Sequence, residues 1–558
     1  MNIKQINSLV ELFFLKKKEI DAKESFLQWL KPNHNSIYNW EEVSEKILKL
    51  SNKIKNLIKK GDRCLIISEN RPEWLISDIA IMNAGGISVP IFTTYASSDY
   101  EYIIKDCSPE LIIISNSLQF KKIQKFIKDK KIISFEEIDK NSLLIQNIFK
   151  DNNEDEINFT IERKSPACII YTSGTSGNPK GVVLSHGGIL SNCEGAISLL
   201  KILIKKKPIF LTWLPLSHSY EHTVQFIQIL IGAKIFYAES LEKLISNMSE
   251  AKPNIMTAVP RFYQNLYNKI NSNFSKQKGL KKRLILKTIK LGKKTLKKEN
   301  FNLNEIIVNF ICEFLVRNKI KKQFGGNLSA FISGGGALDK DIGEFLNAIG
   351  LPTLQGYGLT EASPVVSCNL PNLVKVETVG PPFSTNKVKI ATDGEILVKG
   401  ENIMIGYWNK EKETNEIIKE GWLHTGDIGE IDSEGFLKIT DRKKDLIVNL
   451  GGDNISPTKI ENILCLNENI KQSFVYGDKK NYLVALIVVE KKVDKEKIKQ
   501  VIENLNKNLN IIEKIKKFVL INEEFSVENR MLTPTLKLKR KEIIKNYKQE
   551  LENLYLNK

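Results

Sequence analysis

The stretch YTSGTSGNPKG at residues 171–181 is rich in Gly, Ser and Thr and ends in a lysine followed by a glycine. It follows the apolar run ACII at 167–170, which predicts a buried strand that leads directly into a loop. Glycines let the backbone approach an anion, hydroxyl and N–H groups donate hydrogen bonds, and Lys180 adds a positive charge. The stretch therefore predicts a phosphate-binding loop rather than a generic flexible turn. It is not of the Walker type, because Pro179 precedes Lys180 and no Ser or Thr follows it.

The sequence around this loop has the pattern of an α/β protein. Between residues 61 and 240, short apolar runs such as RCLIIS, ISVPIF and ELIIIS alternate with longer segments of helical period. Fully apolar strands of this kind usually lie in parallel sheets with binding loops at their carboxyl ends. Residues 241–325 are predicted to be mainly helical. We expect two further Gly-rich turns after the strands within SAFISGGGAL at 329–338 and LPTLQGYGLTE at 351–361.

The pattern of predicted elements changes in the C-terminal third of the sequence. From about residue 377, short strands with turn signals predict a compact β subdomain. The residues that follow DRKKD at 441–445 are Lys-rich with mixed α and β character, and they are enough for a small separate domain. We therefore expect a large domain followed by a smaller one.

The chain has 558 residues, 83 Lys and Arg against 65 Asp and Glu, and a formal charge of +18. The basic residues are spread along the chain together with many Ile and Asn residues. This distribution indicates a coding bias that places lysines on solvated surfaces, and it predicts no nucleic-acid partner. The densest basic run, at 276–298, has near-helical apolar spacing. It is expected to be a solvated surface helix, with a basic amphipathic helix at a membrane surface as the alternative.

The cysteine pattern and the hydropathy both predict a cytoplasmic protein. Seven cysteines are present without a CxxC pair or a histidine cluster of metal-site spacing. The N-terminus has no signal-peptide pattern, and no segment is long and apolar enough to span a bilayer. Any contact with the inner face of the membrane is therefore expected to be peripheral.

Five further segments carry a family resemblance: LPLSH at 214–218, QGYGLTE at 355–361, GWLHTGDIG at 421–429, DRKKD at 441–445 and PTLKLKR at 534–540. Together with the loop they resemble, in order, the motifs of the adenylate-forming (AMP-binding) superfamily. The stretches LPLSHSYEHTVQF and IMTAVPRFYQNLYNKI look like those of long-chain fatty acyl-CoA synthetases. The resemblance implies a large N-terminal domain at 1–443, which consists of stacked α/β layers and a β subdomain. It also implies a small mobile α+β lid at 444–558, with Lys444 as the hinge.

The same resemblance implies a nucleotide site. The phosphate-binding residues would be Thr172, Ser173, Gly174, Thr175, Ser176, Gly177 and Lys180. The adenine would lie among Gly334, Gly335, Gly336, Gln355, Gly356, Tyr357 and Gly358. Thr360 would contact the α-phosphate, while Asp427 would accept hydrogen bonds from the ribose hydroxyls beside the donor Arg442.

Catalytic and metal roles follow from the same match. Glu361 is a hard oxygen ligand suited to Mg²⁺ and is paired with Thr172, with Thr175 as the alternative. Lys537 corresponds to the catalytic lysine of the lid, where a positive charge would stabilise the transition state of carboxylate attack on ATP. The family commonly has Gly before this lysine, whereas this chain has Leu536. The neighbours Lys539, Arg540 and Lys541 are alternatives for the same role.

The expected activity is ATP-dependent conversion of a long-chain fatty acid to acyl-AMP and then to its CoA thioester, with Mg²⁺ as cofactor and CoA as co-substrate. His218 would orient the acyl carboxylate or gate the thiol channel, or else be an ordinary core histidine. Apolar positions that could line an acyl tunnel or belong to the core are Phe226, Ile229, Val259 and Phe262. The alternatives are a carrier-protein acceptor, another carboxylic acid, or a nucleotide-binding protein without turnover. The sequence does not fix the oligomeric state, with a homodimer as one option.

Overall fold

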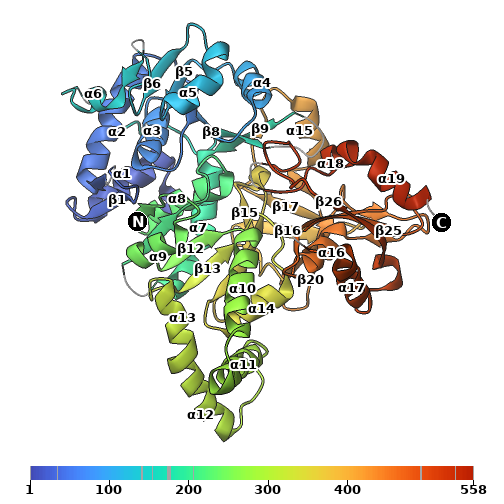
Figure 1. The fold of residues 1–558 in the computed structure, drawn as a ribbon. Helices are drawn as coiled ribbons and strands as arrows, with labels where there is room; N and C mark the ends of the chain where they lie inside the picture. The colour runs from blue at the N-terminus through green and yellow to red at the C-terminus, as the bar shows by residue number, and fades with distance from the viewer. Residues whose placement is uncertain are drawn as a thin grey trace.

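The computed structural model describes residues 2–556 except 34–35, 140–141, 154, 173–177, 205–206, 490–492 and 534–535. Two eight-stranded sheets form the large N-terminal part of the described chain (Figure 1). The first has the order β18-β9-β8-β4-β3-β5-β6-β7. Its strands are β3 (Arg63–Ile67), β4 (Ile87–Ile91), β5 (Leu111–Ile114), β6 (Lys131–Ser134), β7 (Leu143–Leu144), β8 (Pro166–Thr172), β9 (Lys180–Ser185) and β18 (Gly406–Tyr407).

The second sheet has the order β15-β14-β13-β12-β10-β11-β1-β2. Its strands are β1 (Ser25–Trp29), β2 (Ile37–Asn39), β10 (Ile209–Thr212), β11 (Lys234–Tyr237), β12 (Ile255–Ala258), β13 (Ala330–Ser333), β14 (Thr353–Gly358) and β15 (Val365–Cys368). Both sheets are parallel in their centres; the second has antiparallel strands at both edges, and the first at the β18 edge only. The parallel α/β class predicted from the apolar runs is confirmed.

Alternate residues of the strands enter different cores, which shows how the layers stack. Cys64 and Ile66 of β3 enter the largest core, whereas Leu65 and Ile67 enter an outer one. The largest core also includes residues of the second sheet, so the helices that it contains lie between the sheets. These helices are α1 (Leu9–Glu19), α2 (Trp40–Lys55), α3 (Pro72–Asn83), α7 (His186–Leu203) and α8 (Ser219–Leu230).

Further helices cover the two outer faces. The first sheet is covered by α4 (Ser97–Cys107) and α5 (Ser117–Ile123), with η2 (Gln124–Phe126) after them. The short helix α6 (Ile145–Phe149) does not belong to this cover; it packs on α2 and contributes to the largest core. The second sheet is covered by α9 (Leu244–Ala251), α10 (Pro260–Ser275), α13 (Asn318–Gln323) and α14 (Lys340–Ala348). Beyond these, α11 (Gly279–Leu296), α12 (Leu303–Cys312) and the π-helical turn η3 (Glu313–Arg317) form a helical projection at the lower end of the molecule in Figure 1. Two short 3₁₀ turns are η1 (Ile3–Gln5) and η4 (Thr360–Ala362).

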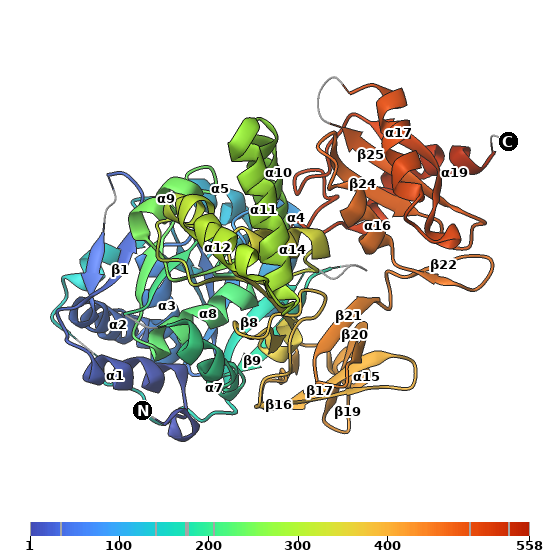
Figure 2. The ribbon, with the colours of Figure 1, turned by 90° about the horizontal axis from the view of Figure 1, so that it is seen from below.

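The C-terminal part consists of two smaller units. The β subdomain contains β16 (Asn386–Ile390), β17 (Glu395–Gly400), α15 (Glu411–Ile417), β19 (Ile418–Lys419), β20 (Trp422–Ile431) and β21 (Leu437–Arg442). After it come β22 (Ile447–Val448), β23 (Asn454–Ile455), α16 (Pro457–Leu464), β24 (Ile470–Tyr476), β25 (Leu483–Val489), α17 (Lys495–Asn506), η5 (Ile511–Glu513), β26 (Ile515–Ile521), α18 (Arg540–Asn546) and α19 (Lys548–Leu556). Figure 2 shows this last unit as a separate body beside the β subdomain. The expected large domain and small α+β domain are therefore present.

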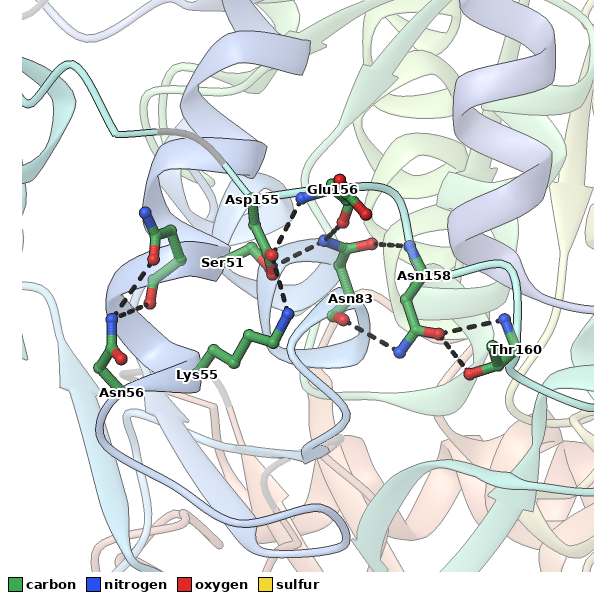
Figure 3. A network of polar contacts seen from close by, with 9 residues as sticks. Ser51, Lys55, Asn56, Asn83, Asp155, Glu156, Asn158 and Thr160 are labelled. Carbon is green, nitrogen blue, oxygen red and sulfur yellow. Dashed lines mark hydrogen bonds and ion pairs between the residues drawn. The ribbon is translucent and has the colours of Figure 1, made fainter.

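A buried polar network anchors the segment that leads into β8. The Asn83 amide donates to Ser51 Oγ at 2.8 Å and to the Glu156 carbonyl at 3.0 Å (Figure 3). Its oxygen accepts from the Asn158 N–H at 2.8 Å, and Ser51 Oγ donates to Asp155 at 3.0 Å. Buried polar groups are costly unless they are paired, so these bonds fix the 155–158 segment on α2 and α3.

Two sequence expectations differ from the structure. Residues Gln355–Gly358 do not form a turn after a strand but belong to β14 itself, paired with β15. A Cβ at Gly358 would lie 2.0 Å from the Pro364 carbonyl oxygen, so the glycine is required by this close pairing. The basic run at 276–298 is a helix, as expected, but α11 also packs its Leu291 and Gly292 side against α14.

Candidate active site

A cavity of about 720 Å³ lies where both sheets, the β subdomain and the C-terminal unit meet. Cavities of roughly this size hold small molecules and cofactors. The predicted site residues that line it are Thr172, Lys180, His218, Gly334, Gly335, Gly356, Tyr357, Gly358, Thr360, Glu361, Arg442, Lys444 and Lys537. Gly336, Gln355 and Asp427 are adjacent to lining residues in sequence but do not line the cavity themselves. Ser173, Gly174, Thr175, Ser176 and Gly177 lie outside the described residues.

The phosphate-binding stretch connects two antiparallel strands. β8 ends at Thr172 and β9 begins at Lys180, and these two residues are directly opposite in the ladder. A Walker loop leads from a strand into a helix. The antiparallel pairing of β8 and β9 is therefore a second reason why this loop is not of the Walker type. The pairing brings Thr172 and Lys180 to the same edge of the cavity.

Tyr407 connects the two charged groups at this edge, and the sequence analysis missed it. Its hydroxyl donates to Glu361 Oε1 at 2.8 Å, and its ring centroid lies 4.7 Å from Lys180 Nζ. Burial, and then the Glu361 carboxylate, raise the pKa of Tyr407, so the hydroxyl stays protonated and can donate. The available signal was the GYW triplet at 406–408, whose Tyr lies on the β18 strand that pairs with β9.

The glycines after β13 border the cavity for two different reasons. A Cβ at Gly334 would lie 2.8 Å from the Tyr220 ring, so the ring occupies the space that a side chain would take. The Tyr220 hydroxyl donates to the Ile332 carbonyl at 3.0 Å and holds the ring there. Gly335 has a φ of +79°, a conformation that favours glycine.

Asp427 and Arg442 form a cross-strand pair in the β subdomain. The strands β20 and β21 place the two residues opposite each other, and Arg442 Nε donates to Asp427 Oδ1 at 2.8 Å. The other carboxylate oxygen accepts from the Tyr357 hydroxyl at 2.6 Å. Each carboxylate oxygen can accept more than one hydrogen bond, so the pair is fixed in place while retaining acceptor capacity for hydroxyl groups.

Lys537 reaches the cavity from the C-terminal unit. The Lys537 side chain is exposed at the open cavity. The surrounding protein atoms nevertheless displace part of the water around its ammonium group, which disfavours the charged form. Desolvation by these protein atoms, and then the Arg442 guanidinium, lower the pKa of Lys537 from 10.5 to about 8, while Asp427 and Glu361 oppose the change. The ammonium is thus close enough to these three groups to interact with them electrostatically.

Two hydrogen bonds join Lys537 to Thr533. The Thr533 N–H donates to the Lys537 carbonyl at 2.8 Å, and the Lys537 N–H donates to Thr533 Oγ1 at 3.0 Å. Leu536, which directly precedes Lys537, has a φ of 62°. The left-handed conformation explains why glycine suits the position that precedes the lysine.

The three alternatives to Lys537 are among the residues that the structure describes, and none of them lines the cavity. Arg540 Nη2 contacts Glu461 at 2.6 Å within the C-terminal unit, and that pair is largely buried. Lys539 and Lys541 do not line the cavity. Lys537 is therefore the cation of this segment that reaches the cavity.

His218 has a structural contact and also a position at the cavity. It is the N-cap of α8, where Nδ1 accepts from the Tyr220 N–H at 3.2 Å, and it also lines the cavity. Burial, and then the charge of Lys537, lower its pKa to about 4. The imidazole is consequently neutral at physiological pH, with the proton assigned to Nε2 by the capping bond.

Two polar contacts hold the C-terminal unit against the N-terminal domain. Gln264 Nε2 on α10 donates to the Cys465 carbonyl at 2.7 Å, and Arg530 Nη2 donates to Ser98 Oγ on α4 at 2.7 Å. Leu466 adds an apolar contact with the core beneath α10. These contacts accompany the arrangement in which Lys537 faces the cavity.

The end of the cavity between α7 and α8 is apolar. It is lined by Ala196, Leu199, Leu200, Phe210, Val224, Ile227 and Ile255. Phe226, Ile229, Val259 and Phe262 do not line the cavity, so of the two alternatives for them the structure supports the core. On α8 the reason is helical periodicity, because Val224 and Ile227 share the face that borders the cavity, whereas Phe226 and Ile229 lie on another face and are fully buried.

The residues at the phosphate end fit a magnesium ion bound together with a nucleotide. Glu361 has a second carboxylate oxygen besides the one that accepts from Tyr407, and Thr172 offers a hydroxyl. Mg²⁺ takes hard oxygen ligands and typically keeps several waters beside one or two protein groups and phosphates. Among the described residues there is no cluster of three or more His, Cys, Asp or Glu side chains of the kind that would bind a metal without phosphate.

Comparison with protein families adds two matches. The AMP-binding enzyme family matches residues 22–408, and the AMP-binding enzyme C-terminal domain matches residues 444–558.

None of the helices in the described part of the chain is long and apolar enough to cross a membrane.

Curated relatives and solved structures resemble the chain over most of its length. Long-chain-fatty-acid–CoA ligase FadD15 of Mycobacterium bovis is 28% identical, with 89% of this chain and 88% of the relative covered. Long chain acyl-CoA synthetase 3 of Arabidopsis thaliana is 30% identical, with 93% and 87% covered. The structure of o-succinylbenzoate CoA synthetase from Bacillus subtilis with its acyl-adenylate intermediate has a TM-score of 0.73 at 20% identity, with 95% and 97% covered.

Proposed function

Because the chain belongs to the AMP-binding enzyme family, we propose that it is an AMP-forming ligase that joins a long-chain fatty acid to CoA. The observation that carries the proposal is the cavity, whose lining combines the charged residues Lys180, Glu361 and Lys537 with an apolar wall from α7 and α8. An amphiphilic acid would place its chain along that wall and its carboxylate near the charges. The relatives named as long-chain ligases support this choice, although the o-succinylbenzoate enzyme has the same fold.

The first half-reaction would join the carboxylate to the α-phosphorus of ATP and release pyrophosphate. Attack adds negative charge to the phosphate and carboxylate oxygens, and Lys537, which lines the cavity, would stabilise that charge. Lys180 would contact the phosphates, and Glu361 and Thr172 would hold Mg²⁺, which neutralises phosphate charge when bound.

The ribose and base would be held by the β subdomain and the second sheet. Asp427, fixed by Arg442 and Tyr357, would accept from the ribose hydroxyls. Tyr357 and Gly335 would border the base, and Thr360, whose hydroxyl lies 2.9 Å from Ser219 Oγ, would contact the α-phosphate.

The second half-reaction would let the CoA thiol displace AMP from the acyl carbonyl. We place the domain border at 443/444 and assign Lys444, in the exposed turn between β21 and β22, as the hinge. Rotation there would withdraw Lys537 and break the Gln264–Cys465 contact. Hinges are short segments that absorb large backbone changes, and this turn has few buried contacts to oppose them.

The test is pyrophosphate release with Mg²⁺ and ATP across saturated fatty acids of increasing length, with o-succinylbenzoate and benzoate as non-fatty controls. The proposal expects release to peak with long chains and acyl-CoA to form when CoA is added. A preference for an aryl acid would overturn the substrate class, and turnover with acyl carrier protein in place of CoA would overturn the acceptor. Acid-independent nucleotide binding without release would overturn the enzymatic function.

A further inference from the structure

The helix α12 exposes its apolar face and not its polar one. Leu303 is 80% exposed and Phe310 is 74% exposed, and Ile306, Ile307 and Phe314 are exposed as well. These positions repeat at the spacing of a single helical face that continues into η3. We call the side chains of these five residues the α12 stripe.

The opposite face of α12 carries the polar side chains. Glu305 accepts from Lys294 Nζ of α11 at 2.8 Å, Asn309 accepts from Arg317 at 2.9 Å, and Cys312 is buried near Leu284. A surface helix normally buries its apolar stripe and exposes its polar face. Because this helix does the reverse, and contiguous exposed apolar surface is uncommon on proteins without a partner, the α12 stripe is a docking surface.

Charge on the neighbouring helix indicates the kind of partner. Residues 276–298 contain no Asp or Glu. Lys281, Lys282, Arg283, Lys287 and Lys290 of α11 are exposed, and none of them forms a salt bridge with another described residue. An apolar stripe that shares one helical projection with several exposed cations matches the boundary between anionic headgroups and acyl chains. Two copies of this surface facing each other would instead bring like charges together.

We propose that the α11–α12 projection docks on anionic phospholipid membranes, with the α12 stripe inserted among the acyl chains and the α11 cations on the headgroups. The projection lies at the lower end of the molecule in Figure 1, beyond α10 and α14, where it is free to approach a flat surface. None of the described residues between 258 and 331 lines the cavity. Docking therefore stands apart from the chemistry and does not depend on the proposed substrate.

The test uses the full chain and flotation with two kinds of vesicle: phosphatidylcholine alone, and phosphatidylcholine mixed with phosphatidylglycerol. The chain is expected to float with the mixed vesicles, and F310S/F314S should weaken this binding at least tenfold. K281E/K282E/R283E should abolish the preference for the anionic lipid. The matched control is Ile511→Ser in the C-terminal unit, where an equally exposed apolar side chain lies outside the projection, and it should bind like the unmodified chain.

Three outcomes would overturn the proposal. The first is absence of flotation of the unmodified chain at physiological salt, and the second is unchanged flotation of F310S/F314S. The third is a stable dimer in sedimentation velocity that F310S/F314S converts to monomer without any vesicle binding, because the stripe would then be a self-association surface. Pyrophosphate release with a water-soluble short-chain acid should be unchanged in the stripe variant, which confirms that it is folded.

Discussion

Tyr407 donates a hydrogen bond to Glu361 while its ring faces Lys180, so one side chain connects the carboxylate and the lysine at the phosphate end of the cavity. Tyr407 lies on the short strand β18, which pairs with β9, the strand that begins at Lys180. The geometry of the site therefore depends on a two-residue strand contributed from more than 200 residues farther along the chain.

Tyr407→Phe should lower acid-dependent pyrophosphate release about tenfold and raise the Mg²⁺ concentration needed for half-maximal rate. A hydrogen bond to a charged group contributes about 1.5–3 kcal/mol, and water in the open cavity would recover part of it. The phenyl ring keeps its contact with Lys180, so ATP binding should change little, whereas Tyr407→Leu should weaken both. An unchanged Mg²⁺ dependence in the Phe variant would show that Glu361 is positioned without this bond.

Lys537→Ala should reduce adenylate formation about 10²–10³-fold, because it removes a preorganised charge from the transition state. Thioester formation from supplied acyl-AMP and CoA should be spared. Lys444→Pro should do the opposite and impair the second step more, since it stiffens the proposed hinge. Lys541→Ala is the matched control, an exposed lysine four residues away that does not line the cavity. Equal losses in both assays for both variants would contradict alternating use of one site.

The adenylation rate should depend on the charge of Lys537. Its pKa is lowered to about 8, so the ammonium is charged below pH 8 and is lost as the pH rises through that value. The rate should therefore fall above about pH 8 rather than near pH 10. His218, with a pKa lowered to about 4, stays neutral over this range and does not contribute to the change. In Lys537→Arg the alkaline fall should disappear, because guanidinium stays protonated. A fall that persists in this variant would have to come from another group.

Leu536→Gly should stabilise the C-terminal unit by about 0.5 kcal/mol. The left-handed φ of 62° costs a residue with a side chain about 1–2 kcal/mol, and the greater unfolded-state entropy of glycine offsets about 0.5–1 kcal/mol. The Leu536 side chain is exposed, so little packing is lost. Thermal unfolding checks the gain. Leu536→Ala keeps the strained φ and should not stabilise, so an equal gain in both variants would place the effect in the exposed side chain instead.

The parts of the fold that could be predicted are those encoded by local pattern. Apolar runs such as that around Ile66 predict buried parallel strands, and the Gly-rich stretch after β8 predicts a loop at a strand end. The sequence could not show that β1, at residues 25–29, inserts beside β11, more than 200 residues away. Pairing over such a distance depends on tertiary packing, which has no local signal.

The same limit applies to the site. Motif matches identified Lys180, Glu361 and Lys537, but Tyr407 lies in a triplet whose role becomes visible only when β18 pairs with β9. Apolar residues of α8 could not be divided between cavity and core, because every residue of that helix is buried. Apolar periodicity distinguishes the buried face of a helix from its solvent-exposed face. A helix that is buried on all sides has no exposed face, so its pattern cannot show which residues border a cavity.

The apolar wall offers the last prediction, because Ala196 of α7 is a small residue that borders the cavity. Ala196→Phe should fill part of the space and shift the preference towards shorter acids. Each methylene that can no longer be buried costs about 0.8 kcal/mol, or roughly fourfold in kcat/KM, so the longest acids should lose at least about tenfold relative to short ones. Ala196→Ser is the matched control, since it changes polarity with little change in size. The KM for ATP should stay constant in both variants, because Ala196 belongs to the apolar wall of the cavity and is not one of the residues proposed to bind the nucleotide. A uniform loss across all chain lengths would indicate general damage to the fold, and an unchanged length profile would place the acyl chain elsewhere.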